Sequence, residues 1–92
     1  MIMRTIRLQD AIFFHARPAA CIASEAKKYE SMILFTVDGQ MADAKKALSV
    51  MRLGDPKDRM VEIITDGSDE AEAMQAMEHA LESVVPAAIP FF

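Results

Sequence analysis

The chain has little cysteine, no excess of basic residues and no long apolar run, and each absence excludes a class of protein. Its one cysteine, Cys21, cannot form an internal disulfide, which suits a reducing cytoplasm. The net charge of −4 argues against a nucleic-acid-binding surface. No apolar run has the length of a signal sequence or a membrane-spanning helix, so we expect a cytoplasmic protein without membrane insertion. No internal repeat and no cofactor-binding motif is visible, and no cofactor is expected.

The amino-acid composition and the length of the chain indicate one folded domain. Apolar residues make up 52% of the 92 residues, which is enough for a hydrophobic core. A chain of this length suits a single domain, so we expect one domain over residues 1–92. Residues 85–92 form an apolar tail that contains two prolines.

Hydrophobic periodicity predicts alternating strands and helices. The first half of the chain predicts a strand over residues 2–8, a helix with Pro18 in its first turn that runs to Tyr29, a strand over 32–37, a hairpin turn at Asp38-Gly39 and a return strand beginning at 41–42. The apolar stripe expected on that helix consists of Ala19, Ile22, Ala23, Ala26 and Tyr29. The second half predicts a short helix that is capped by Asp43, runs to Leu53 and is stopped by Gly54, then a strand over 60–65, and a last helix capped by Ser68 and ended by Pro86. The order β-α-β-β-α-β-α predicts an α+β fold. Its four-stranded sheet should be mainly antiparallel, with all three helices on one face and the other face open to water.

The segment His15-Ala16-Arg17-Pro18 places an imidazole at the entry to the first helix. Main-chain N–H groups and the positive end of the helix dipole bind anions at such a position. Arg17 adds a planar donor for phosphate oxygens. Positive surroundings keep a histidine neutral, and only a neutral imidazole has a lone pair that attacks phosphorus. The pattern indicates a phosphoryl acceptor at His15, with the backbone of Ala16 and Arg17 as the receptor for the phosphoryl oxygens.

The same residue types have ordinary explanations. A histidine at a helix start is also typical of a solvent-exposed side chain, and Arg17 of a solvated arginine. We expect Cys21 to be a small packing residue, because a nucleophilic thiol needs a paired base that the sequence does not show. His79 lies in the last helix without ligand spacing to His15, so no metal site is expected.

Three sequence blocks together resemble the HPr family, the histidine-containing phosphocarriers of the bacterial phosphotransferase system. The blocks are His15–Ala19, Val50–Gly54 and Gly67–Glu70, and their spacing fits the family without gaps over nearly the whole chain. The resemblance implies an open-faced β-sandwich and a carrier rather than an enzyme. It further implies that His15 accepts a phosphoryl group from enzyme I through its Nδ1 atom, that Arg17 stabilises the group, and that a sugar-specific enzyme IIA domain receives it.

The resemblance also implies a docking surface across the first two helices. The positions that match it carry apolar or small side chains with basic neighbours: Phe14, Ala20, Lys45, Ala47, Leu48, Met51 and Arg52. Basic residues at the rim would speed encounter with acidic partners. The alternative is that Leu48 and Met51 are simply core residues of a short helix.

The chain departs from the family at several positions. Ile12-Phe13-Phe14 stands where the family usually has a polar residue followed by Gly-Leu, so the orientation of the phosphorylated ring is altered or an apolar collar fits a particular partner. Lys46 occupies the position of the regulatory serine of many Gram-positive members, so serine-kinase control is not expected there; Ser49 is a weak substitute. Asp58 replaces the usual glycine after the second helix. The apolar tail is longer than expected and favours self-association over packing on this chain's own core.

Three hypotheses for function follow. The first is a phosphotransferase-system phosphocarrier that serves enzyme I and enzyme IIA domains. The second is a regulatory HPr-like paralogue that acts through protein binding, with little or no role in sugar transport. The third is a structural interaction domain without phosphorylation, which the retention of His15 and Arg17 argues against.

Overall fold

A computed structural model of the chain describes residues 1–8, 16–54 and 60–88, with 82–88 as backbone only. The elements follow the predicted order: β1 Ile2–Arg7, α1 Ala16–Ala26, β2 Met32–Val37, β3 Gln40–Asp43, α2 Ala47–Met51, β4 Met60–Asp66 and α3 Glu70–Ala88. The strands form a four-stranded sheet in the order β1-β4-β2-β3, and every neighbouring pair is antiparallel. The predicted α+β fold is therefore confirmed.

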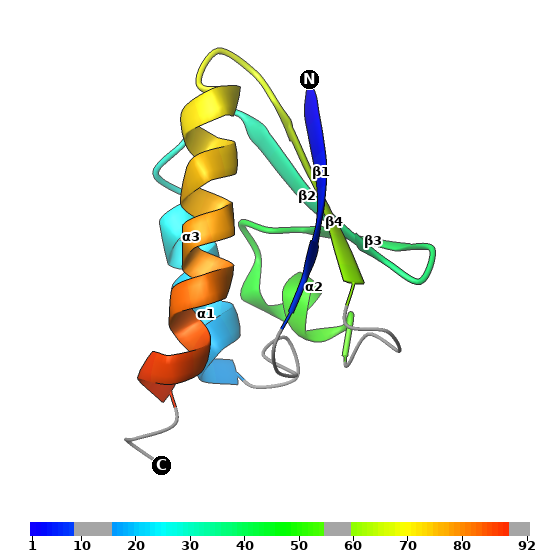
Figure 1. Cartoon of the computed structure of the whole chain (residues 1–92), viewed down its shortest axis with the longest axis vertical. Coiled ribbons are helices and arrows are strands. Elements are labelled where there is room, and N and C mark those ends of the chain that lie inside the picture. Colours follow the sequence, from blue (N-terminus) through cyan, green and yellow to red (C-terminus); the bar gives the residue numbers. More distant parts are fainter. Residues whose placement is uncertain (9–15, 55–59, 89–92) are drawn as a thin grey trace.

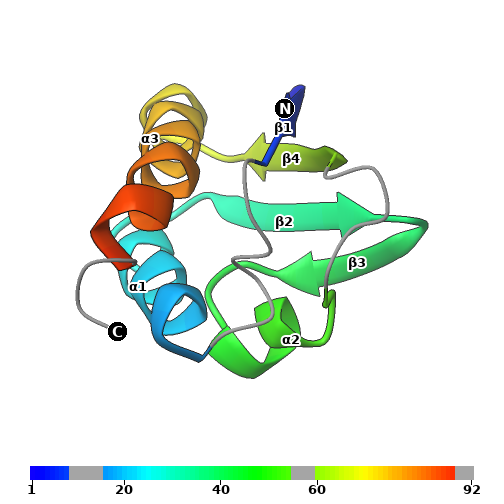
Figure 2. The ribbon, with the colours of Figure 1, turned by 60° about the horizontal axis from the view of Figure 1, so that its bottom comes forward.

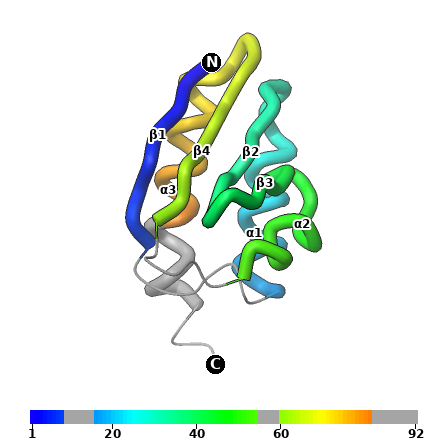
Figure 3. The backbone as a smooth tube through the Cα atoms, turned by 90° about the vertical axis from the view of Figure 1, so that its right-hand side faces the viewer, coloured from blue at the N-terminus to red at the C-terminus, as the bar shows by residue number. Residues whose placement is uncertain are grey.

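Two long helices cover one face of the sheet. Helices α1 and α3 lie side by side on one side of the strands, at the left of Figure 1, and within the described residues no helix lies on the sheet's other face (Figure 3). Helix α2 lies beyond β3 and packs against α1, at the edge of the sheet rather than across its middle (Figure 2). The layers thus leave the opposite face of the sheet open, as the sequence predicted.

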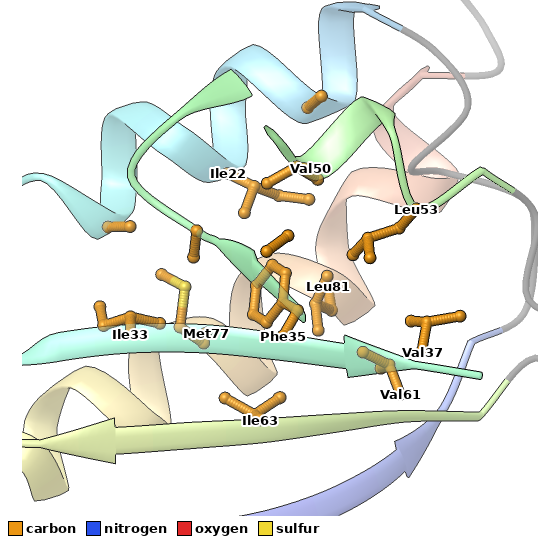
Figure 4. Close-up of a cluster of buried hydrophobic side chains, with 14 of the residues drawn as sticks. Ile22, Ile33, Phe35, Val37, Val50, Leu53, Val61, Ile63, Met77 and Leu81 are labelled. Carbon is orange, nitrogen blue, oxygen red and sulfur yellow. The ribbon is translucent and has the colours of Figure 1, made fainter. Parts of the chain in front are cut away.

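Alternation along the two central strands decides which side chains enter the core. In β2 the fully buried side chains include Ile33 and Phe35, and in β4 they include Ile63, while their immediate neighbours in each strand face the other side. All three helices add side chains to this core. Figure 4 shows Ile22 from α1, Val50 from α2, and Met77 and Leu81 from α3. Met74 of α3 is buried in the same cluster. Burial of each large apolar side chain contributes about 1.5–3 kcal/mol. The helices are held mainly by this packing, because α2 is too short to be stable alone.

The hairpin between β2 and β3 follows from its two turn residues. Asp38 has φ +50° and Gly39 has φ +82°. Positive φ at both positions is the conformation that tight two-residue hairpins require, and Asp-Gly is a favoured sequence for it. The predicted hairpin is confirmed.

Helix α1 ends earlier than predicted. It stops at Ala26, and Tyr29 is a half-buried residue beyond it. The N–H of Lys28 bonds the carbonyl of Glu25, and the N–H of Tyr29 bonds the carbonyl of Ala26. This tighter turn redirects the chain into β2, although the buried stripe of α1 matches the prediction.

Helix α2 is also shorter than predicted, and Asp43 does not cap it. Asp43 is the last residue of β3 and pairs with Leu34. Its Oδ1 accepts a hydrogen bond from the Lys45 N–H at 2.9 Å, and its own N–H donates to Ser49 Oγ at 3.1 Å. Strand pairing therefore places Asp43 in β3, although local capping rules predict it as the cap of α2. Gly54 follows the helix with φ +67°, in accord with a glycine stop.

Both predicted ends of α3 are wrong. Ser68 is not the cap: its hydroxyl donates to Glu30 Oε2 at 3.5 Å, while Glu70 Oε1 accepts the Gly67 N–H at 3.1 Å. Glu70 thus reaches back to a backbone N–H three residues before it, as the glutamate of a capping box does, although here it is the first residue of the helix. At the other end the backbone stays helical through Pro86 to Ala88. A proline near the end of a long, packed helix removes one backbone hydrogen bond without stopping the chain from completing its turn.

A carboxylate clasp joins the start of α3 to the start of β2. Asp69 accepts the N–H groups of Glu30 and Ser31, each at 2.9 Å, and also the hydroxyl of buried Ser31. The Ser31 hydroxyl, followed by the Glu30 N–H, holds the pKa of Asp69 below its ordinary value. Gly67 packs so closely on Ser31 that an added Cβ would lie 2.6 Å from Ser31 Oγ. The clasp therefore fixes α3 against the sheet.

Replacing Asp69 with Asn should destabilise the fold in a pH-dependent way. A carboxyl with a depressed native pKa stabilises the fold at neutral pH, and this contribution is lost as the pH falls through that pKa. Urea unfolding should show a clear loss of stability at pH 7 that shrinks progressively below about pH 5. Glu72→Gln, an exposed carboxyl on α3, is the matched control; an equal loss for both variants, or a loss for Asp69→Asn that does not change with pH, would contradict the clasp.

Candidate functional site

The first turn of α1 has an exposed cationic end. Helix α1 begins at Ala16, the residue after His15 in the sequence, and Ala16 and Arg17 are exposed. Pro18 and Ala19 of the same turn are buried and hold the helix start against the core. His15 itself, with Phe14 and Ile12, lies outside the described residues.

The electrostatics of this turn favour an anion. The first N–H groups of a helix have no partner within the helix, and they carry the positive end of its dipole. The first turn of α1 contains no acidic side chain. Arg17 adds a positively charged guanidinium with a planar fork of N–H donors. A doubly charged phosphoryl group at this helix end would therefore meet donors and positive charge.

The expected docking residues divide into exposed and half-buried sets. Leu48 is 72% exposed, so the alternative that it is a core residue is wrong. Ala20, Lys46 and Arg52 are exposed as well. Ala47 and Met51 are half-buried and pack against the core. Met51 is therefore partly a core residue, as the alternative to a docking role predicted. Because α1 and α2 pack together, these residues share the α1–α2 side of the molecule (Figure 2).

Lys45 has a structural contact that the sequence did not indicate. Its Nζ donates a hydrogen bond of 2.7 Å to the carbonyl of Tyr29, just after α1. A cation close to the end of a helix meets the partly negative carbonyl groups there. This bond ties the segment before α2 to the end of α1, so Lys45 is less available to a partner than Lys46 or Arg52.

The structure also shows where Cys21 and His79 lie, and it corrects the prediction for Cys21. Cys21 is exposed rather than packed, because Ala19, Ile22 and Ala23 occupy the buried stripe of α1. His79 is exposed on α3. In the part of the chain that is described, His, Cys, Asp and Glu residues form no group of three that could hold a metal ion.

The sequence predicts the family's regulatory position at Lys46. The structure places Lys46 immediately before α2, where its side chain is exposed. Ser49 is half-buried, and its hydroxyl oxygen accepts the Asp43 N–H. The described helices also include none that is long and apolar enough to cross a membrane. Asp58 lies outside the described residues.

Comparison with known proteins gives a consistent result. The family described as "PTS HPr component phosphorylation site" matches residues 2–83. The phosphocarrier protein HPr of Treponema pallidum is 30% identical over 90% of this chain and 94% of its own length. A multiphosphoryl transfer protein of Vibrio cholerae is 34% identical over 86% of this chain, which spans only 20% of that larger protein.

Solved structures show the same fold. The HPr of Thermoanaerobacter tengcongensis has a TM-score of 0.81 at 34% identity, covering 90% of this chain and 93% of the other. Crh of Bacillus subtilis, described as a swapped dimer, has a TM-score of 0.71 at 27% identity, covering 89% of this chain and 94% of the other. The fold and these similarities define a phosphocarrier of the phosphotransferase system. Within that class, the chain belongs to the HPr family.

Removing the ammonium of Lys45 should destabilise the fold. Lys45→Met keeps most of the side-chain length but loses the bond to the Tyr29 carbonyl, and a hydrogen bond from a charged donor is worth about 1–3 kcal/mol when partly buried. Chemical denaturation should show a loss of about 1–2 kcal/mol. Lys46→Met, the exposed neighbour, should change stability by less than about 0.5 kcal/mol. A reversed order of the two effects would exclude the structural role of Lys45.

Proposed function

We propose that the chain is a phosphoryl carrier that accepts a phosphoryl group on His15 from enzyme I and passes it to an enzyme IIA domain. The observation that carries the proposal is that α1 begins at the residue after His15, with exposed Ala16 and Arg17 and without an acidic side chain in its first turn. Membership of the HPr family supports the same chemistry.

The transfer step needs a nucleophile and a receptor for negative charge. A neutral imidazole nitrogen of His15, Nδ1 by family resemblance, forms the new N–P bond while the N–P bond to the enzyme I histidine breaks. Main-chain N–H groups at Ala16 and Arg17, with the Arg17 guanidinium, receive the phosphoryl oxygens. The reverse geometry hands the group to the next acceptor. No cofactor is required, and the chain acts as a transient covalent carrier rather than as an enzyme that releases a product.

The partner surface we propose centres on Leu48. Its side chain is 72% exposed, and Lys46 and Arg52 are exposed on the same short segment. An apolar centre with a basic rim suits a partner with an apolar patch and acidic surroundings, and such charge complementarity raises the encounter rate. Phe14, Ala20, Ala47 and Met51 would extend the contact toward His15. The proposal places this exchange in the cytoplasm.

A regulatory role is the second candidate. Similarity to Crh, described as a catabolite repression protein, and the altered segment Ile12-Phe13-Phe14 favour it. Lys46 argues against regulation through a phosphoserine at that position, because its side chain carries a positive charge where phosphoserine would carry a negative one. The carrier function is therefore the better supported of the two.

His15→Ala should abolish phosphorylation. We expect incubation with enzyme I and labelled phosphoenolpyruvate to give wild-type protein an acid-labile label, typical of phosphohistidine, that the variant lacks. His79→Ala, which removes an exposed histidine on α3, should keep the label and serves as the control. Adding an enzyme IIA domain should then discharge the labelled protein; label that forms but is never passed on would favour the regulatory candidate, and no label at all would exclude the carrier.

Arg17→Ala should slow transfer without unfolding the protein. Loss of one donor to a developing phosphoryl charge typically lowers a rate about 10²–10³-fold. Arg17 is exposed, so its replacement should leave thermal stability nearly unchanged. Single-turnover phosphorylation by enzyme I measures the rate, with Arg17→Lys as the matched variant that keeps the charge and loses the fork of donors. Wild-type rates for Arg17→Ala would remove this residue from the mechanism.

A further inference from the structure

Helix α2 carries Leu48, the centre of the proposed partner surface, although a helix of five residues is not stable alone. Lys46, at the position before the helix, makes no side-chain capping bond. Within the segment, the N–H of Val50 bonds the Lys46 carbonyl and the N–H of Arg52 bonds the Leu48 carbonyl. Contacts outside the helix must therefore fix the position of Leu48 relative to α1.

Three hydrogen bonds made by side chains supply such contacts. Lys45 Nζ donates to the carbonyl of Tyr29, just after α1, at 2.7 Å. Ser49 Oγ accepts the N–H of Asp43, the last residue of β3, at 3.1 Å. The carboxylate of Asp43 in turn accepts the Lys45 N–H at 2.9 Å. We call these three bonds the α2 anchor, because they join the α2 segment to the end of α1 and to β3.

The α2 anchor does what apolar burial alone cannot do. Val50 is fully buried and keeps α2 on the core, but apolar burial has no preferred direction. Hydrogen bonds weaken steeply when their geometry is distorted, so they fix orientation. The side chains of Lys45 and Ser49, which make the anchor, are half-buried, whereas Lys46, Leu48 and Arg52 are exposed. The anchor and the proposed partner surface thus use different side chains of one segment.

We propose that Lys45 and Ser49 are positioning residues for phosphoryl transfer. They hold α2 beside α1 (Figure 2) in the arrangement that a phosphotransfer partner binds, without contacting the partner themselves. This inference rests on the proposed function, since it needs a partner that docks on both helices, at Ala20 of α1 and at Leu48 of α2. If α2 shifts relative to α1, only a fraction of the molecules presents both together, and the apparent affinity falls by that fraction.

A positioning role has a specific kinetic signature. The first turn of α1, beside His15 in the sequence, is held by buried Pro18 and Ala19 and not by the α2 anchor. Loss of an anchor bond should therefore weaken docking and leave the chemical step unchanged. With this chain as the substrate of enzyme I, KM should rise while kcat stays the same.

The test combines kinetics with hydrogen exchange of the free protein. Lys45→Met and Ser49→Ala each remove anchor bonds of one side chain. Steady-state phosphorylation by enzyme I should give each variant a KM about 3–10-fold above wild type. Without any partner, the amides of Val50 and Arg52 should exchange about 10-fold faster in both variants, because α2 opens more often. Lys45→Arg, which keeps a charged donor for the Tyr29 carbonyl, should restore most of both properties.

Two matched variants separate the bond from its side effects. Lys46→Met removes the neighbouring exposed cation and should leave the exchange of the α2 amides at the wild-type rate. Thr65→Val removes the bond from buried Thr65 Oγ1 to the Glu70 carbonyl, which lowers stability between β4 and α3. It should leave both KM and the exchange of the α2 amides unchanged. Thermal unfolding verifies that every variant is folded at the temperature of the assay.

Four results would overturn the positioning role. A raised KM for Lys45→Met without faster exchange in α2 indicates that Lys45 contacts the partner directly. Faster exchange with an unchanged KM shows that docking does not depend on the position of α2. Equal effects of Lys46→Met on exchange indicate a loss of charge rather than of a bond, and an equal rise in KM for Thr65→Val indicates general destabilisation.

The carrier function fails in a different way. Wild-type protein that enzyme I does not phosphorylate at all would exclude the carrier function and, with it, a role of Lys45 and Ser49 in transfer. Normal phosphorylation of wild type with any of the four results above would overturn the positioning role alone.

Discussion

Burial of alternate residues of β2 and β4 against helices on one side is the constraint on which the rest of the structure depends. Ile33, Phe35 and Ile63 take the core side, and Ile22, Val50 and Met77 approach them from the three helices. This packing positions α1 so that Ala16 and Arg17 of its first turn are exposed, and it holds the short α2 beside α1. A helix of five residues keeps its place only through such contacts.

The same constraint leaves apolar side chains exposed in two layers of the molecule. Once every second strand residue enters the core, the residues between them face outward, and here they include four exposed methionines: Met3, Met32, Met41 and Met60. Anchoring of α2 by Val50 leaves Leu48 exposed, with exposed Lys46 and Arg52 on the same short segment.

Contacts between distant segments fix the details that decide how these layers meet. Asp69 bonds the backbone at Glu30 and Ser31, and Lys45 bonds the carbonyl of Tyr29. The Asp69 bonds join the start of α3 to the start of β2, and the Lys45 bond joins the segment before α2 to Tyr29, just after the end of α1. They hold these helix ends at fixed positions, whereas buried Pro18 and Ala19 hold the first turn of α1 against the core.

Sequence alone determined the order of the elements, the buried stripe of α1 and the hairpin at Asp38-Gly39. The phosphoryl-acceptor pattern around His15 and Arg17 also comes from the sequence and stays a prediction. These depend on local periodicity, turn chemistry and residue spacing, which are readable one segment at a time. Only the tertiary structure decided the ends of the helices and the exposure of Cys21, Leu48 and the methionines. Asp43 illustrates the reason. Local capping rules predict it as the cap of α2, but in the structure it pairs with Leu34 and is the last residue of β3. Whether a side chain is buried, bonded or exposed depends on which distant segment packs against it, and a one-dimensional pattern does not contain that information.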